Sequence, residues 1–218
     1  MVAESLLIRK SVVLGFALIY WIGVLIQVYR VRKRIGRSPN VKPRGLKETL
    51  LWGGWLFVIG GWIGQPLWVG SIPSPFLSLR PFIMQRTVMF LGVLMMVSGY
   101  GGTLWCYAAL GDAWRMGIRK REKTILVRNG PYRFVRHPIY LFQTLMLLGA
   151  FLLLPTPFSL LLFGIHLLCI YLKAFDEEAY LLTVHGSEYR DYLSRTGRFL
   201  PKIGKVIAPL TISNEKGS

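Results

Sequence analysis

The chain has 218 residues with a formal net charge of +17 at pH 7, and 53% of its residues are hydrophobic. Its mean hydropathy of +0.44 excludes an ordinary water-soluble domain, because the charged residues are few and cluster between long apolar runs. The basic residues lie beside these runs and form no recognisable binding module, so we expect no nucleic-acid partner. The composition therefore predicts an all-α integral membrane protein with one multi-span domain over residues 1–218.

Four long apolar runs follow one another, and Pro155-Thr156-Pro157 breaks the last one, so we predict about five transmembrane helices. The predicted spans are residues 11–29, 49–69, 87–110, 139–154 and 158–172. The first three have 19, 21 and 24 residues, close to the roughly 20 that cross a hydrocarbon core. The last two are shorter, and the uncharged turn between them predicts a helical hairpin, with a re-entrant hairpin as the alternative.

Charge counting predicts the topology of these spans, since short cytoplasmic loops retain Lys and Arg. Of the 27 basic residues, 23 fall in the loops 30–47 and 115–136 and in the part from residue 173 onward, whereas four fall on the other side. We therefore expect the N-terminus outside and the C-terminus in the cytosol. The net charge then follows from topology and from attraction to anionic membrane lipids.

Small residues and tryptophans within the spans are expected to serve packing and interfacial anchoring. The two cysteines lie inside apolar runs without metal-ligand spacing, so we expect no metal. The third span carries five small residues that predict close contact with a neighbouring helix: Gly92, Ser98, Gly99, Gly101 and Gly102.

The loop between the third and fourth spans departs from this generic pattern. Its apolar stretch Thr124-Ile125-Leu126-Val127 lies between basic patches and predicts a short extended piece against the membrane face. Asn129-Gly130-Pro131 then predicts a turn. His137-Pro138 opens the fourth span, where a helix N-terminus presents free N–H groups and a partial positive charge that favour an anion.

Charged and aromatic residues reinforce this helix start. Arg133 and Arg136 strengthen the anion site, and Tyr132 and Tyr140 suit stacking on a nucleoside. At the far end of the hairpin, Asp176-Glu177-Glu178 follows the fifth span. A hairpin brings both groups to one membrane face, which predicts a site for a zwitterionic, positively charged cofactor. Membrane anchoring by the Arg and Tyr residues, and a surface ion pair between Lys173 and Glu177, are the alternatives.

Over residues 110–201 the chain resembles the isoprenylcysteine carboxyl methyltransferase family, which is related to the membrane phospholipid methyltransferases. The motifs that carry the resemblance are Leu126-Val127, Gly130-Pro131-Tyr132, Arg136-His137-Pro138-Ile139-Tyr140, Glu177-Glu178 and Gly186-Ser187-Glu188-Tyr189-Arg190-Asp191-Tyr192. The resemblance implies a multi-span helical enzyme that binds S-adenosylmethionine in a cytosolic pocket. A lipophilic methyl acceptor is then expected to enter between the helices.

The resemblance also implies residue roles. The expected cofactor-binding residues are Thr124, Ile125, Leu126, Val127, Tyr132, Arg136, His137, Pro138, Ile139, Tyr140 and Glu177. Lys173 stands where the family has a substrate-contacting arginine, and lysine keeps the charge but loses the bidentate fork for a carboxylate. A carboxylate acceptor needs only such a cation nearby, whereas an amine or a thiol must lose its proton, with Glu178 as the candidate base.

Three reactions are therefore alternatives: carboxyl methylation, phospholipid N-methylation and thiol S-methylation. A non-enzymatic transporter and an NADPH-dependent membrane reductase are rivals from other classes. A transporter would bury polar groups near the midplane, and sterol reductases, whose C-terminal region resembles this hairpin, have more spans. The absence of a eukaryotic retrieval signal leads us to expect a prokaryotic cytoplasmic membrane.

Overall fold

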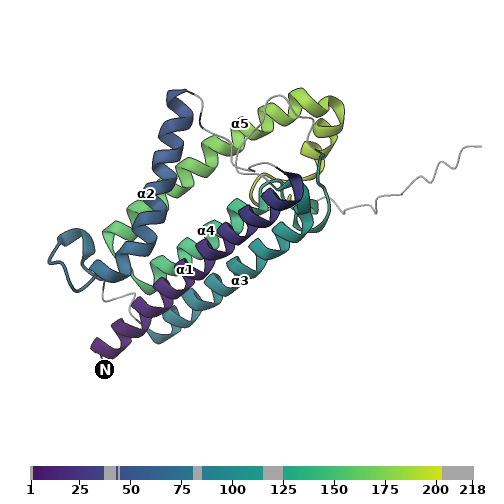
Figure 1. Ribbon diagram of the computed structural model, residues 1–218. Helices are drawn as coiled ribbons and strands as arrows, with labels where there is room; N and C mark the ends of the chain where they lie inside the picture. Colours follow the sequence, from purple (N-terminus) through teal and green to yellow (C-terminus); the bar gives the residue numbers. More distant parts are fainter. Residues whose placement is uncertain (1, 37–42, 44, 81–84, 115–124, 203–218) are drawn as a thin grey trace, which may run out of the picture.

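The computed structural model describes residues 2–36, 43, 45–80, 85–114 and 125–202, and five long helices dominate this part of the chain (Figure 1). They are α1 (Val2–Ile35), α2 (Leu46–Trp68), α3 (Arg86–Leu110), α4 (Pro138–Leu153) and α5 (Pro157–Arg195). The short 3-10 helices η1 (Pro75–Leu77), η3 (Gly111–Ala113) and η4 (Gly130–Arg133) lie in the connections. These residues form no strand, only an isolated parallel bridge between Val135 and Gly197. The predicted all-α fold is confirmed.

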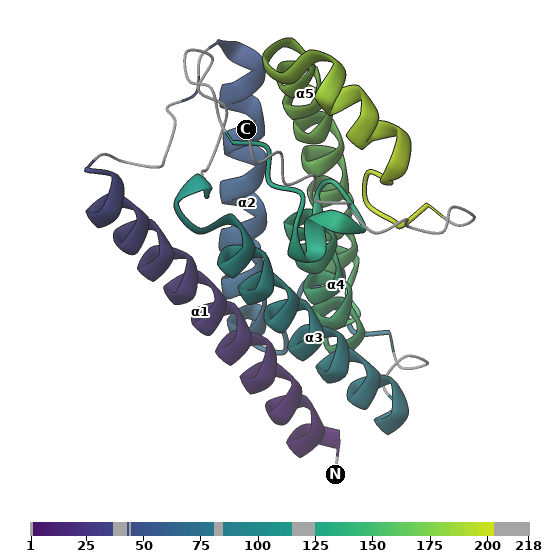
Figure 2. The same cartoon turned by 90° about the vertical axis from the view of Figure 1, so that its right-hand side faces the viewer.

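Three of the helices, α1, α3 and α5, are long and apolar enough to cross a membrane. α4 is apolar but shorter, and a full crossing by α2 and α4 stays a prediction. Figure 2 shows α1 and α3 running obliquely across α2, α4 and α5. In the same view α1 and α2 diverge toward the end that carries the second part of α5.

Glycines allow α3 and α4 to pack closely. A Cβ atom at Gly99 would lie 2.6 Å from the carbonyl oxygen of Phe142, and one at Gly92 would lie 2.9 Å from that of Gly149. Close contact is therefore confirmed at these positions. The prediction of close contact is wrong for Gly101, because an added Cβ atom there would have nothing within 4 Å.

The predicted hairpin of α4 and α5 is confirmed, and polar side chains stabilise its turn. Thr156 caps α5 by accepting a hydrogen bond from the N–H of Ser159, and the Ser159 hydroxyl accepts one from the N–H of Thr156. From α2, the buried Gln65 amide donates to the carbonyl of Leu154 over 3.2 Å. From α1, the buried Arg9 donates to the carbonyls at the end of α4. These contacts satisfy carbonyl groups that a helix end leaves without partners.

α5 is longer than the predicted span 158–172, because the helix continues through the polar residues to Arg195. Its direction changes at Gly186, where φ is 53° and ψ is −118°, a conformation that favours glycine. The segment after this bend, yellow-green in Figure 2, folds back beside the rest of α5. The bend turns Tyr189 and Tyr192 toward the start of α4, where the candidate site lies.

Candidate active site

A cavity of about 370 Å³ lies among the five long helices, each of which contributes residues to its lining. One wall comes from α4, α5 and the chain that precedes α4, and it carries Arg136, His137, Tyr140, Lys173 and Glu177. The other wall comes from α1 and α2, and apart from Glu48 it is aromatic and aliphatic. Its residues include Tyr20, Trp21, Val24, Leu51, Trp52, Trp55, Leu56 and Ile59. The cavity therefore combines a charged wall with an apolar one.

Most of the predicted site residues meet at this cavity. Those that line it are Ile125, Leu126, Val127, Tyr132, Arg136, His137, Ile139, Tyr140, Lys173 and Glu177. Pro138 and Glu178 lie behind them and are not part of the lining. Thr124 falls outside the residues that the structure describes. The apolar residues 125–127 have no regular secondary structure.

The start of α4 is held in place by the chain that follows α5. His137 is the N-cap residue and Pro138 occupies the first turn, where its missing N–H costs no hydrogen bond. The backbone N–H groups of Arg136 and His137 donate to the carbonyls of Gly197 and Arg198, over 2.9 and 3.1 Å. This pairing brings the Arg198 side chain to the site from a part of the sequence some 60 residues away.

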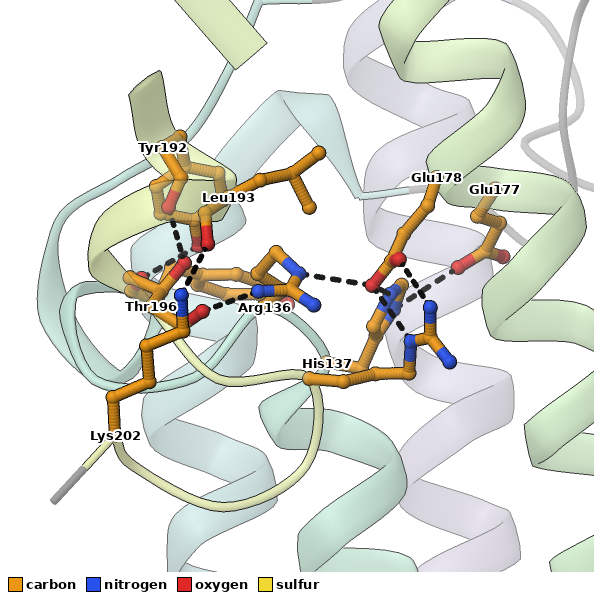
Figure 3. A network of polar contacts seen from close by, with 10 residues as sticks. Arg136, His137, Glu177, Glu178, Tyr192, Leu193, Thr196 and Lys202 are labelled. Atoms are coloured by element: carbon orange, nitrogen blue, oxygen red, sulfur yellow. Dashed lines mark hydrogen bonds and ion pairs between the residues drawn. The ribbon is translucent and has the colours of Figure 1, made fainter. Parts of the chain in front are cut away.

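Glu178 is the centre of a buried ion-pair cluster (Figure 3). Arg198 donates to both of its carboxylate oxygens, over 3.0 and 2.7 Å. Arg136 Nε donates over 2.9 Å, and His137 Nε2 lies 3.2 Å away. Burial opposes ionisation, but the hydrogen bonds from His137, Arg198 and Arg136 outweigh it and hold the pKa of Glu178 well below its usual range. Such a carboxylate is a poor proton acceptor.

Glu177, in contrast, faces the cavity while two neighbours hold it. The Tyr140 hydroxyl donates to Oε1 over 2.9 Å, and His137 Nδ1 lies 3.4 Å from Oε2. The rings of His137 and Tyr140 stack with centroids 5.6 Å apart. Burial disfavours the charged form of His137, but the hydrogen bonds and charges of Glu177 and Glu178 raise the pKa of the ring. The arrangement presents a fixed carboxylate to a cationic ligand.

Two contacts fix the turn before α4 to the last part of α5. The Tyr192 hydroxyl donates to the carbonyl of Tyr132 over 2.6 Å. Arg128 and Glu188 form an ion pair with N···O 2.8 Å. Gly130 makes this turn with φ 56°, a conformation that glycine adopts without strain.

Lys173 lines the cavity without an ion pair to another residue in the described part of the chain. The surface pair with Glu177 is therefore not formed, and the nearby Asp176 binds Lys47 of α2 instead, with N···O 2.6 Å. Within the same ranges, no group of three or more His, Cys, Asp and Glu residues is arranged to hold a metal ion.

Sequence reasoning missed the contribution of α1, α2 and α3. Tyr20, Trp55 and Tyr107 line the cavity, but we expected the tryptophans of the second span to serve only packing and interfacial anchoring. These residues come from helices far apart in the chain, so no local motif joins them. Gln143 also lines the cavity, and an amide inside an apolar helix was a signal that could have identified it.

One comparison with known proteins has a match over the part of the chain that carries the charged wall. Residues 87–188 match the phospholipid methyltransferase family model. The chain is 29% identical over 117 residues to the nickel-cobalt-cadmium resistance protein NccN of Alcaligenes xylosoxydans xylosoxydans, a match that covers 54% of this chain and 50% of that protein. It is 31% identical over 121 residues to the protein-S-isoprenylcysteine O-methyltransferase of Saccharomyces cerevisiae, with 52% and 48% covered.

The chain thus spans about half the length of the curated relatives that it matches. Residues 87–188, which match the family model, contain the Arg136-His137-Pro138 start of α4 and the Glu177-Glu178 pair of α5. Of these residues, Arg136, His137 and Glu177 line the cavity. The resemblance predicted from these motifs is confirmed: the chain is similar over residues 87–188 to the phospholipid methyltransferase family model, and over 121 residues to the yeast isoprenylcysteine methyltransferase.

Proposed function

We propose that this protein is an S-adenosylmethionine-dependent methyltransferase that acts at a membrane interface on a lipophilic acceptor. The observation that carries the proposal is a cavity whose lining combines a charged wall of motif residues with a mainly apolar wall from α1 and α2. Its volume of about 370 Å³ is in the range of small-molecule sites. The similarity to two methyltransferase groups supports the same activity.

The residues of the charged wall fit this cofactor. Glu177, oriented by Tyr140 and His137, suits the ammonium group of the methionine part. The positive end of α4 suits its carboxylate. Tyr132 and the apolar side chains of residues 125–127 suit the nucleoside. We assign cofactor binding to these groups, with Arg136 and Pro138 shaping the start of α4.

When bound, the cofactor supplies an electrophilic methyl group. The protein then has to hold the acceptor in line with that methyl and exclude water, which are the main contributions to a displacement of this kind. Lys173 provides a cation on the cavity wall for an anionic acceptor group. Glu178 is better suited to positioning its neighbours than to removing a proton from the acceptor. Its carboxylate is surrounded by Arg136, His137 and Arg198, and it does not line the cavity.

The relatives indicate several alternative classes of methyl acceptor. The yeast relative is named for carboxyl methylation of an isoprenylcysteine, and lysine in place of the family's arginine makes a carboxylate less specifically bound here. The family model is named for phospholipids, so phospholipid N-methylation is the first alternative and thiol S-methylation the second. We place the protein in a prokaryotic cytoplasmic membrane with this cavity on the cytosolic side.

Calorimetric titration of S-adenosylhomocysteine into the purified protein tests the cofactor site. We expect binding in the wild type, loss of binding in His137→Ala and Glu177→Ala, and unchanged binding in Asp191→Ala, a control on α5 whose side chain is 48% exposed. Thermal melting shows whether each variant is folded. Wild-type protein that binds NADPH and not S-adenosylhomocysteine would instead support a reductase.

A further inference from the structure

A second polar group lines the cavity one helical turn beyond the proposed cofactor contacts. Gln143 follows Tyr140 on α4 by three residues, an axial rise of about 4.5 Å away from the mouth of the helix. Its amide Nε2 donates to the hydroxyl of Tyr20 on α1 over 2.6 Å. Both residues line the main cavity, together with Tyr107 of α3. An uncharged polar pair therefore lies next to the charged wall, inside the apolar part of the bundle.

Tyr20 is held firmly in this position. It is 2% exposed, and its ring contacts Trp21 edge-on with centroids 5.1 Å apart and Trp62 with centroids 5.7 Å apart. A phenol buried in an apolar span is costly unless its hydroxyl is hydrogen-bonded. Polar groups in such places are by default candidates for a functional site.

Gln143 is only partly satisfied by this contact. Its Oε1 atom is buried and has no hydrogen-bond partner among the described residues. A buried acceptor without a donor carries a desolvation cost that a protein normally avoids. An N–H or O–H group of a ligand in the cavity would remove this cost, whereas an ionised carboxylate has no proton to donate.

A purely structural role is the competing explanation. The Tyr20–Gln143 hydrogen bond joins α1 to α4, and a void of about 10 Å³ borders both residues. A void of this size is close to the minimum for one water molecule. A buried water that donates to Gln143 would leave the pair without a role in ligand binding.

We propose that Gln143 and Tyr20 form the subsite that discriminates between acceptors, with Gln143 accepting a hydrogen bond from an N–H or O–H group of the acceptor's headgroup. The inference rests on the proposed function, because it assigns the deeper part of the same cavity to the methyl acceptor. Tyr20 lies outside the matched residues 87–188. Half of the subsite thus comes from the part of the chain that the family similarity does not cover.

Two amphiphiles of equal chain length test the subsite without knowledge of the acceptor. Lauramide carries N–H donors and methyl laurate carries none. Each is titrated into the full-length protein in phosphatidylcholine nanodiscs with saturating S-adenosylhomocysteine, and binding is followed by tryptophan fluorescence. The variants are Gln143→Met, which keeps the side-chain length, and Tyr20→Phe. Tyr29→Phe is the control, since Tyr29 lies on the same helix and is 66% exposed.

The wild type and Tyr29→Phe are expected to bind lauramide about fivefold or more tightly than methyl laurate, the size of one neutral hydrogen bond. Gln143→Met removes this preference, and Tyr20→Phe reduces it, while the Kd for S-adenosylhomocysteine stays the same in all four proteins. Equal affinity of the wild type for both amphiphiles, or a preference that persists in Gln143→Met, overturns the subsite. Failure of the wild type to bind S-adenosylhomocysteine counts instead against the proposed function.

Discussion

Glu178 and Glu177 are adjacent in sequence but differ in their surroundings. Glu178 is 8% exposed and neutralises Arg136, Arg198 and His137, whereas Glu177 is 24% exposed and lines the cavity. On a helix, successive residues point about 100° apart, so one carboxylate faces inward to the cluster and the other faces the cavity. The pair therefore divides into a residue that holds the site together and a residue that is free to contact a ligand.

Replacing the buried carboxylate tests this division. Glu178→Gln keeps the shape of the side chain but leaves two arginines without their anion. Loss of one partner from a buried ion pair costs about 3–5 kcal/mol, so we expect the apparent melting temperature to fall by more than about 5 °C. The control is Glu188→Gln, which breaks the exposed pair with Arg128 and should change stability by less than about 1 kcal/mol. Equal melting temperatures for the two variants would contradict the role of Glu178.

His137 gives the site a predictable pH dependence. Because Glu177 and Glu178 raise its pKa above the usual value, the protonated ring stabilises the folded state. That contribution is complete below a pH of about 6.5, the unfolded value, and is lost as the pH rises through the raised pKa. The difference in melting temperature between the wild type and His137→Gln should therefore shrink between pH 6 and pH 9. A difference that grows with pH would show that the ring is neutral in the folded protein.

At the level of elements, the contact between α3 and α4 depends on the absence of side chains. Gly99→Val places a methyl group against the Phe142 carbonyl and the Met146 side chain, and the helices have to separate. Overpacking of this kind costs about 1–3 kcal/mol, visible as a lower melting temperature. Gly101→Val on the same helix meets open space and is the control. Similar melting temperatures for both variants would mean that α3 and α4 are not in close contact.

The bend in α5 makes a second prediction at this scale. Gly186→Ala adds a side chain that meets nothing within 4 Å but sits at φ 53°, so its cost of about 1–3 kcal/mol is conformational strain. A straighter α5 would move Tyr192 away from Tyr132 and weaken binding of S-adenosylhomocysteine. Gly164→Ala, in the regular part of α5 and also in open space, should leave affinity unchanged and should not lower stability, since alanine favours a helix more than glycine. Retained affinity in Gly186→Ala would show that the bend does not support the site.

The sequence predicted elements best where apolarity alone determines them. Each predicted apolar span overlaps one helix, and Pro155-Thr156-Pro157 does separate α4 from α5. The continuation of α5 beyond residue 172 was missed, because polar residues such as Lys173 and Glu177 carry no span signal although they are good helix formers. The bend at Gly186 depends on φ and ψ values, which a glycine permits but does not require.

The site residues also divide into those that the sequence grouped correctly and those that it did not identify. Residues near each other in the chain, such as His137 and Tyr140, were grouped by motif and indeed share the cavity wall. Arg198 reaches Glu178 through backbone pairing with the start of α4, and Tyr20 reaches Gln143 across 123 positions. Such contacts depend on how the helices pack, which a single sequence does not specify.

At the scale of the whole molecule, the two walls of the cavity come from different parts of the chain. The charged wall lies within or next to residues 87–188, the region similar to methyltransferases, and the apolar wall belongs to α1 and α2. With the proposed function, a molecule built in this way could keep one cofactor site while changes in the first two helices alter the acceptor that it binds. The proposed subsite at Tyr20 is one place where such a change acts.

The orientation of this molecule in the membrane is a further prediction, because a cytosolic cofactor requires the charged wall to face the cytosol. The distribution of 23 basic residues against four predicts that the connection between α2 and α3 lies outside and the end of α5 inside. Single cysteines at the exposed positions Ser71 and Ser194 can report this, since the native Cys106 and Cys169 are buried and should react slowly. With a membrane-impermeant maleimide on intact spheroplasts we expect labelling of Ser71→Cys alone, and labelling of both after lysis. Labelling of Ser194→Cys on intact cells would place the cavity on the wrong side for a cytosolic methyl donor.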